Sequence, residues 1–388
     1  MIGWREGIVT ALGRGWPGAR ELRALVGETE LKVLAYPHLV GEPHVGDRIL
    51  LNVTAQAMGL GTGGYALAIA LPDRLPQDPP PGPGHVVKAR YTPLQTIVLG
   101  ADEQDSPHHE LLREADDLDG MPVITADLHS ALPAVCAAIQ HDRPGTRVAY
   151  VMTDGGALPL WFSRTVAGLR EAGWLCGSVT TGQAFGGDLE AVTVHTGLLA
   201  AKLVLGAEVA VVSQGPGNLG TGTKWGFSGV ACGEAVNAAA TLGGRAIGVL
   251  RVSEADPRER HRGLSHHSVT AYGRVALAAA ELALPRGPGT RAVSSTSTDE
   301  GAAEAASGTS GDSAAASGSS EAFWDAVRAQ AEPLAARHRL REVDPAGLDE
   351  ALAASPVPLS TMGRGLDADR ANFLAAACAG RLAVTTTR

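Results

Sequence analysis

The sequence has few aromatic residues and few cysteines for its 388 residues. Phe, Trp and Tyr make up only 4% of the chain, so the hydrophobic core has to be built mainly from Val, Leu, Ile and Ala. The four cysteines (Cys136, Cys176, Cys232 and Cys378) are far apart, and no pair has C-x-x-C spacing. This spacing argues against both a disulfide framework and a zinc knuckle.

Signals for membrane insertion, secretion and nucleic-acid binding are also missing. No segment approaches about 18 consecutive apolar residues, and the N-terminal MIGWREGIVT lacks the apolar core of a signal peptide. The net charge is −9, and residues 1–100 carry nine Lys and Arg against eight Asp and Glu. We therefore expect a cytoplasmic protein without a membrane or nucleic-acid partner. A homo-oligomer is compatible with the sequence.

Residues 1–104 read as a succession of short strands. Leu22, Ala24 and Val26 alternate with charged or polar neighbours, and this period of two is typical of half-buried strands. Gly and Pro separate the strands at turns such as LPQDPPPGPGH. A small β-barrel or β-sandwich is the predicted N-terminal domain.

Residues 105–286 follow a different rhythm, in which apolar strands alternate with helices of about ten residues or more. This alternation predicts a doubly wound, mostly parallel α/β domain with a Rossmann-like arrangement. The predicted strands cover 122–127, 147–153, 191–195, 208–214 and 245–252. The predicted helices cover Ala131–Gln140, Leu160–Ala172, Gly197–Leu205, Gly229–Leu242 and Val269–Leu282.

The last third of the chain is predicted to contain a linker and a helical tail. Residues 287–320 are rich in Ser, Ala, Gly and Thr and have almost no large apolar group, so they are predicted to be a disordered linker. Residues 321–388 read as helices interrupted by the short extended segment RLREVD. We expect this tail to pack on the α/β domain.

Polar, glycine-rich loops follow the predicted parallel strands. Ligands of open parallel sheets bind outside the carboxyl ends of the strands, and loops longer than about six residues at that edge usually carry function. The loops are Asp127–Ser130, Thr153–Pro159, Thr180–Glu190, Ser213–Gly226 and Ser253–Ser268. Their convergence on one edge predicts a ligand-binding crevice there.

The glycine-rich loop SQGPGNLGTGTKWG is a candidate cradle for an anion. It only partly matches the dinucleotide-binding G-x-G-x-x-G pattern, and it does not fit the phosphate-binding G-x-x-x-x-G-K-[ST] pattern. Backbone N–H groups and hydroxyls of Gly215, Gly217, Gly220, Thr221 and Thr223 would hold the anion. The alternatives are a nicotinamide or flavin site, or a tight crossover in which glycine serves only close packing.

Several carboxylates and one histidine fall at other strand ends. Asp154 is a candidate for catalysis, as a metal ligand or proton acceptor, or it caps the next helix. Asp188 and Glu190 form a pair that suits a divalent cation such as Mg²⁺, although a solvated strand entrance has the same pattern. His129 is a further candidate metal ligand, and a hydrogen-bonded core histidine is the alternative.

The loop SEADPRERHRGLSHHS holds three histidines and supports three interpretations. In the first, a metal is bound by His261, by one of the adjacent His266 and His267, and by Asp256 or a carboxylate of another loop. We expect only one of the adjacent pair to join His261, because neighbouring side chains diverge in regular structure.

The other two interpretations of this loop need no metal. In the second, Arg258 or Arg262 clamps an anion while a histidine acts as acid or base. In the third, Asp–Arg pairs fix the shape of a surface loop. The residues alone leave all three open.

Long motifs along the chain resemble a bacterial family known as domain of unknown function 3866. The motifs are YPHLVGEPHVGDRILLN, LGTGGYALAIA, RYTPLQ, TDGGALP, TGQAFGGDLEAV, GPGNLGTGT, DPRERHRGLSHHS and STMGRG. The resemblance covers most of the chain apart from 287–320, and it implies no activity, cofactor or catalytic residue. The predicted site therefore depends on the loops themselves.

The leading hypothesis is an enzyme that acts on a small anionic substrate, phosphorylated or nucleotide-like, by hydrolysis or group transfer. A histidine would move a proton, and a divalent metal is a candidate cofactor. The alternative is a non-catalytic regulatory protein that binds a nucleotide or metabolite with the same glycine-rich loop. A nucleic-acid-binding barrel conflicts with the near-neutral charge of residues 1–100.

Overall fold

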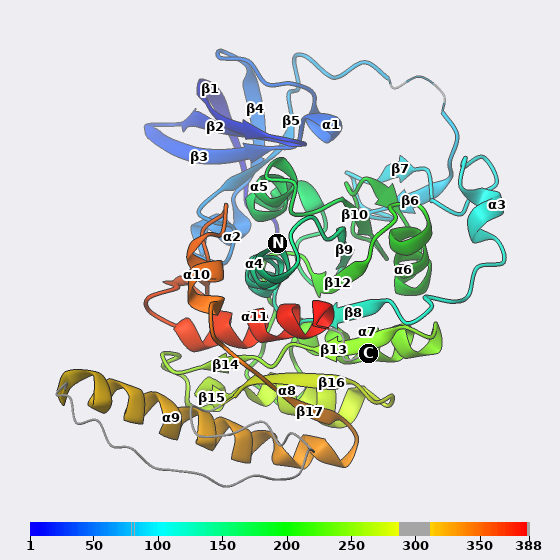
Figure 1. The fold of residues 1–388 in the computed structure, drawn as a ribbon. Coiled ribbons are helices and arrows are strands. Elements are labelled where there is room, and N and C mark those ends of the chain that lie inside the picture. The colour runs from blue at the N-terminus through cyan, green and yellow to red at the C-terminus, as the bar shows by residue number, and fades with distance from the viewer. Residues whose placement is uncertain (79, 81, 287–310, 386–388) are drawn as a thin grey trace, which may run out of the picture.

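A computed structural model describes residues 1–78, 80, 82–286 and 311–385, the side chains of 311–320 excepted. The chain forms a five-stranded barrel followed by an eight-stranded sheet covered by helices (Figure 1). The predicted fold class, a small β-barrel or sandwich before a doubly wound α/β domain with a helical C-terminal extension, is thereby confirmed.

The N-terminal barrel is closed, with strand order β1-β2-β3-β5-β4 and β4 pairing back onto β1. Leu22 and Ala24 of β2 and Val33 of β3 are buried in its core, which confirms the expected alternation. The strands are β1 (Trp4–Trp16), β2 (Ala19–Val26), β3 (Thr29–Ala35), β4 (Arg48–Asn52) and β5 (Ala66–Ala70). Two short helices, α1 (Pro37–Val40) and α2 (Thr54–Ala57), flank β4.

The second part is built on an entirely parallel sheet, in the order β11-β10-β9-β12-β8-β13-β16-β17. Every residue of β9 and β12 is buried, as expected for strands that helices cover on both faces. The strands are β8 (Pro122–Thr125), β9 (Val148–Thr153), β10 (Gly177–Thr180), β11 (Leu189–Glu190), β12 (Val209–Gln214), β13 (Arg245–Gly248), β16 (Glu281–Pro285) and β17 (Arg339–Val343).

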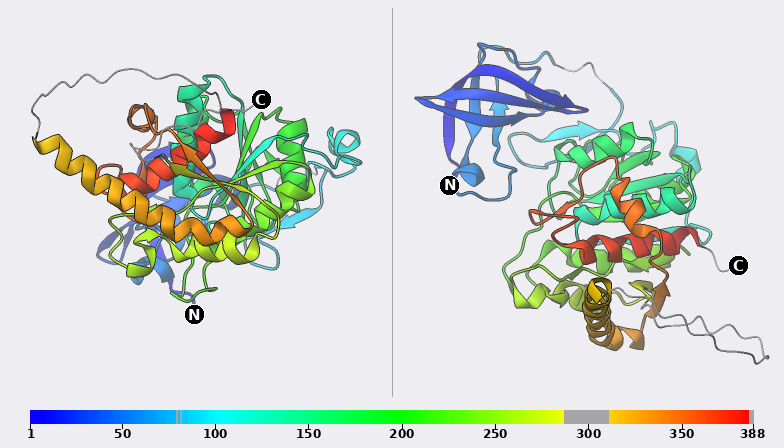
Figure 2. Two further views of the ribbon diagram at one scale, coloured as in Figure 1. Left: turned by 60° about the horizontal axis from the view of Figure 1, so that its bottom comes forward. Right: turned by 60° about the vertical axis from the view of Figure 1, so that its left-hand side comes forward.

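Helices cover both faces of this sheet (Figures 1 and 2). On one face, α4 (Leu132–Asp142) packs against α10 (Leu348–Ala353) and α11 (Arg370–Val384). A Cβ at Gly380 of α11 would lie 2.4 Å from the carbonyl oxygen of Val135, so α4 and α11 approach closely only because this residue is glycine. On the other face, α6 (Val194–Leu203) packs against α7 (Ala231–Thr241).

Smaller elements connect these layers. The short strands pair as β6 (Val86–Lys88) with β7 (Thr96–Val98), β14 (Val252–Ser253) with β15 (Gly263–Leu264), and β18 (Ser360–Thr361) with β19 (Arg364–Gly365). The remaining α-helices are α3 (His109–Leu112), α5 (Arg164–Glu171), α8 (His266–Thr270) and α9 (Gly311–Ala331). Single 3₁₀ turns cover His129–Ala131, Leu160–Phe162, Ser228–Val230, Glu259–His261 and Glu332–Ala336, and a π-helical turn covers Ala271–Val275.

Two predicted elements are wrong, and strand β10 was not predicted. The helix predicted over Val269–Leu282 ends with the π-helical turn. ELALP becomes strand β16, because its backbone pairs with β13 and β17 and its apolar side chains are buried on the faces of the sheet. The strand predicted at 191–195 is the start of helix α6, which Thr193 caps. The missed strand β10, GSVT, is too short and too polar to be recognised by its pattern.

The predicted linker and the tail are described only in part. Residues 287–310 of the linker lie outside the described residues, and the backbone of 311–320 forms the first half of α9. The extended segment RLREVD forms the edge strand β17, so the tail is part of the α/β domain. No helix in the described part of the chain is long and apolar enough to cross a membrane.

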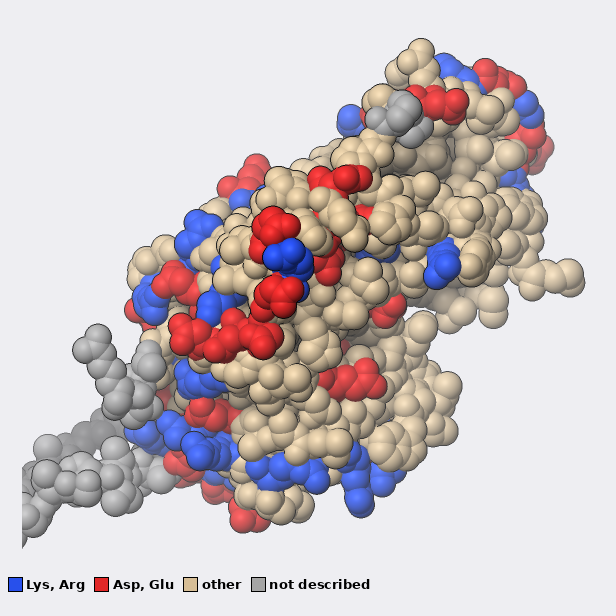
Figure 3. Space-filling view, turned by 90° about the vertical axis from the view of Figure 1, so that its right-hand side faces the viewer, with Lys and Arg blue, Asp and Glu red and all other residues tan. Residues whose placement is uncertain are grey.

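Trp161 joins the barrel to the α/β domain. The indole N–H of Trp16 donates to the carbonyl oxygen of Trp161 at 2.6 Å, and the Trp161 ring stacks on His38 with centroids 5.0 Å apart. On the side of the molecule shown in Figure 3, acidic and basic side chains are interspersed.

Candidate functional site

A topological switch point lies between β8 and β12, two adjacent strands at the centre of the sheet, because the chain leaves them towards opposite faces. After β8 it crosses to α4 on one face, and after β12 it crosses to α7 on the other face. The two loops therefore diverge, and the space between them at the carboxyl ends of the strands is where open parallel sheets bind ligands. The loop that follows β13 lies beside this space, because β13 is the other neighbour of β8.

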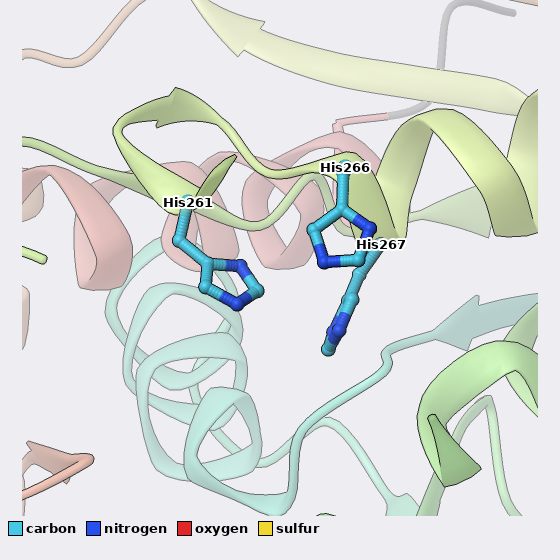
Figure 4. Close-up of side chains that lie close together, drawn as sticks. All are labelled: His261, His266 and His267. Carbon is cyan, nitrogen blue, oxygen red and sulfur yellow. The ribbon is translucent and has the colours of Figure 1, made fainter. Parts of the chain in front are cut away.

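Three histidines from the loop after β13 come together at this edge. The short hairpin of β14 and β15 folds the loop back on itself, and Ser265 then caps helix α8, whose first two residues are His266 and His267. The ring centroids are 4.9 Å apart for His261 and His266, 4.8 Å for His261 and His267, and 4.5 Å for the adjacent pair. Figure 4 shows the three rings turned towards a common space.

The expectation that only one of His266 and His267 would join His261 is wrong. One ring nitrogen from each of the three lies within 4.8 Å of the others. The adjacent pair can converge because Ser265 is still extended, with φ −62° and ψ 140°, and the helix only begins after it. His266 and His267 therefore lie in the first turn of α8, where no earlier helical turn crowds their side chains.

The histidine rings differ in their hydrogen-bond partners. His261 Nδ1 lies 2.7 Å from Ser265 Oγ. His267 Nδ1 lies 3.3 Å from Asp127 Oδ2 and 2.9 Å from Arg251 Nη1. His266 Nε2 is buried and has no hydrogen-bond partner. An unpartnered buried nitrogen of this kind is rare in proteins and calls for a specific explanation.

Burial keeps the imidazoles of His261 and His266 neutral. It lowers the pKa of His261 to about 3, with Arg251 adding to the effect, and it lowers the pKa of His266 to about 4. For Asp127, burial alone raises the pKa, but His267 and Arg251 lower it further than that, so the carboxylate is ionised. The cluster therefore combines two neutral rings, those of His261 and His266, with one buried carboxylate.

Asp127 and Arg251 belong to the site, although the sequence analysis did not select them. Asp127 lies two residues beyond the end of β8, and Arg251 follows β13, so both come from strands that border the crevice. Their side chains are buried, with Arg251 Nη1 3.5 Å from Asp127 Oδ2. A carboxylate just beyond a buried strand end was the available signal, but in this segment the metal ligand was predicted at His129.

Asp256 and Arg258 form a structural pair beside the histidines. The Arg258 guanidinium binds both carboxylate oxygens of Asp256, at 2.9 and 2.8 Å, and Arg364 approaches the same carboxylate at 3.3 Å. The hydrogen bonds from Arg258 hold the pKa of Asp256 far below its usual range. This part of the loop fits the interpretation in which Asp–Arg pairs fix its shape.

Arg262 is exposed, and so is Arg260, which sequence reasoning did not select. Both border a groove of about 640 Å³ between this loop and helix α9, and His266 and Phe323 also line it. The groove therefore meets the histidine cluster at His266.

The glycine-rich loop after β12 forms a tight turn. A Cβ at Gly215 would lie 2.6 Å from the carbonyl oxygen of Ala157, and Gly217 has φ +92°, so both positions require glycine. Gly220 pairs with Phe227, and the hydroxyls of Thr221 and Thr223 lie 3.0 Å from each other. Only Gly215 packs closely, because a Cβ at Gly217 would have no neighbour within 4 Å and one at Gly220 none nearer than 3.9 Å. Residues 219–225 are exposed, so the anion cradle stays a prediction.

His129 lies on the opposite side of β8 from the cluster. Its Nδ1 is 3.0 Å from the hydroxyl of Tyr150, and its Nε2 is 2.8 Å from the hydroxyl of Ser163. Burial lowers its pKa to about 4. Both nitrogens are occupied, as the core-histidine alternative requires.

The remaining carboxylates lie at the far strands β9 to β11. Asp188 accepts hydrogen bonds from the backbone N–H and the hydroxyl of Ser178 and pairs with Arg170. Glu190 lies 3.5 Å from the buried ammonium of Lys88. Asp154 is exposed and accepts a hydrogen bond from the backbone N–H of Gln183 at 2.9 Å. The structure therefore groups none of them with the histidines.

The chain belongs to a family that has no assigned function. The family model described as "Protein of unknown function (DUF3866)" matches residues 32–380, nearly the whole chain, which confirms the family resemblance. Searches found no matching protein of curated function and no matching solved structure.

Proposed function

We propose that the protein is an enzyme that acts on a small anionic substrate, phosphorylated or nucleotide-like, by hydrolysis or group transfer. The observation that carries this proposal is that His261, His266 and His267 converge with the buried Asp127 at the topological switch point of the sheet. Three imidazoles gathered beside a buried carboxylate, with one ring nitrogen left unpartnered, are typical of a reactive centre.

The rim of the groove supports the anionic character of the substrate. Arg260 and Arg262 are exposed there, and His266, a member of the histidine cluster, lines the same groove. Planar guanidinium groups bind phosphate and carboxylate with two hydrogen bonds each. Arg258, the other arginine that the sequence suggested, is held by Asp256, so Arg260 and Arg262 are the better candidates for holding the substrate.

We also propose a cytoplasmic location and no nucleic-acid partner. All four cysteines carry free thiols, which is usual in a reducing compartment. The interspersed charges in Figure 3 and the net charge of −9 give no broad basic surface on that side for a nucleic-acid backbone.

The test is turnover of two chromogenic probes, p-nitrophenyl phosphate and bis(p-nitrophenyl) phosphate, by the full chain dialysed against added divalent metals. We expect turnover that His261→Gln and His267→Gln abolish. Arg262→Gln should raise KM and leave kcat nearly unchanged, because it contacts the anion and not the reacting atoms. His195→Gln is the matched control, since His195 is exposed on α6, away from the cluster.

A nucleotide panel separates the enzyme from the regulatory alternative. If nucleoside phosphates raise the melting temperature of the wild-type protein, while neither probe nor any nucleotide is turned over, the protein is a binding module and the enzyme proposal is wrong.

A further inference from the structure

We infer that His261, His266 and His267 form a binding site for one divalent transition-metal ion of the zinc type. The inference concerns the same site as the proposed function, but it rests on ligand geometry and stands without turnover. Three imidazole nitrogens are the ligand set of catalytic zinc sites, which keep a fourth position open. Imidazole favours zinc, copper, nickel and iron over magnesium and calcium, which prefer oxygen ligands.

The hydrogen bonds around the rings direct the free nitrogens inward. Ser265 Oγ engages Nδ1 of His261, and Asp127 engages Nδ1 of His267, so Nε2 of each ring is left for the cluster. Histidine ligands usually donate their other N–H to a carboxylate or a hydroxyl, which fixes the tautomer and orientation of the ring. His266 adds a buried Nε2 that has no hydrogen-bond partner. A metal ion would satisfy that nitrogen.

The distances require only side-chain movement. The candidate ligand atoms lie within 4.8 Å of one another. A tetrahedral zinc ion with bonds of about 2.05 Å would hold them about 3.4 Å apart, so the farthest pair has to close by roughly 1.4 Å.

Arg251 sets a condition on metal binding. Its Nη1 lies 2.9 Å from His267 Nδ1, closer than Asp127 at 3.3 Å, and a guanidinium can only donate. For Nε2 of His267 to bind a metal, Nδ1 has to carry the proton and donate it to Asp127. The inference therefore makes Asp127 a positioning residue, which acts on the metal through His267.

No other set of His, Cys, Asp or Glu in the described part of the chain meets the same distance criterion. The residues that the sequence suggested as metal ligands, Asp188, Glu190, Asp256 and His129, already have partners in the structure. The three histidines are therefore the place to look for the metal.

The test is a titration of the chelator-treated full chain with Co²⁺, followed by displacement with Zn²⁺. We expect one Co²⁺ per chain, the intense visible absorption of a tetrahedral site, and loss of that absorption when Zn²⁺ displaces the cobalt. Asp127→Asn should weaken binding by about 10- to 100-fold, and His266→Gln by more than that. His195→Gln should bind like the wild type.

The possible results separate the two proposals. Absence of stoichiometric binding by folded wild-type protein overturns the metal site and leaves a metal-free enzyme standing. Binding of one metal without turnover of any probe keeps the metal site and overturns the proposed function. Circular dichroism of each variant shows that it is folded, and if His266→Gln binds as tightly as the wild type the ligand assignment is wrong.

Discussion

The two halves of the sheet edge carry similar residues and use them differently. On the side of β9 to β11, each polar group described above has a partner: His129 has two hydroxyls, and Glu190 has Lys88. On the side of β8 and β13, Asp127 holds one ring, and His266 is left with an unpartnered buried nitrogen. The polar groups of the first half are therefore satisfied by the protein itself, and the second half keeps a buried nitrogen that the protein does not satisfy.

This contrast shows what distinguishes a structural polar cluster from a functional one. Position at the carboxyl end of a strand is common to both, and so is burial of charge. Pairing is what differs, because a buried group with a partner stabilises the fold, while a buried group without one costs about 1–3 kcal/mol. Mutations on the two sides should therefore have opposite consequences for stability and activity.

The largest expected effect on stability comes from Lys88. Its ammonium donates to the carbonyl oxygens of Ala184 and Ala191, at 2.9 and 3.0 Å, and faces Glu190. Burial lowers the pKa of Lys88 and raises that of Glu190, so each charge depends on the other. Lys88→Ala should lower the free energy of unfolding by about 3–5 kcal/mol, measured by urea denaturation.

A double variant sharpens this prediction. Lys88→Met combined with Glu190→Gln removes both charges and keeps most of the volume, so it should be less destabilised than Lys88→Ala alone. Probe turnover should be unchanged in any variant that remains folded. A loss of turnover in the folded double variant would place this half of the edge in the active site and remove the contrast.

His129 gives the next largest effect, and it depends on pH. Its pKa is about 4 in the fold and near 6.5 in an unfolded chain, so the unfolded state takes up a proton first as the pH falls. Stability from the neutral ring is complete above pH 6.5 and is lost progressively towards pH 4. At pH 4.5 the loss from this residue should be about 2.5 kcal/mol.

The matched measurement compares wild type with His129→Gln in urea at pH 7.5 and pH 4.5. The variant lacks this titration, so its deficit relative to wild type should shrink at the lower pH. Other titrating groups, including His261, affect both proteins alike and cancel. If the deficit in the free energy of unfolding were the same at both pH values, His129 would take up a proton as easily in the fold as in the unfolded chain. The lowered pKa of His129 would then be wrong.

Much of the fold follows from local patterns in the sequence. Alternation in β2 and continuous apolar runs in β9 and β12 predict strands, because one face or both faces are buried. Periodicity failed at ELALP, where alanine and leucine fit a helix as well as a buried strand, and only the neighbours β13 and β17 decide between them.

The candidate site was predictable in place and only partly in membership. Strand ends identified the edge and the loop that carries His261. His266 and His267 converge because Ser265 caps helix α8 directly after the hairpin, so that the two histidines are the first residues of the helix. The spacing of the residues in the sequence does not reveal this cap. Asp127 and His129 are two residues apart, and only the path of the chain after β8 turns one towards the cluster and the other towards Tyr150.

The smallest expected effect on stability comes from His266, and it tests the difference between the two halves of the edge most directly. His266→Met removes the unpartnered Nε2 and fills its space, so in the presence of a chelator the variant should be more stable than wild type by about 1 kcal/mol. With Zn²⁺ at about 100 times its dissociation constant the wild type should gain about 2.7 kcal/mol, which reverses the order. Thermal melts of both proteins with chelator and with Zn²⁺ measure the reversal. If His266→Met is destabilised under both conditions, His266 is a structural residue like His129, and the two halves of the edge do not differ.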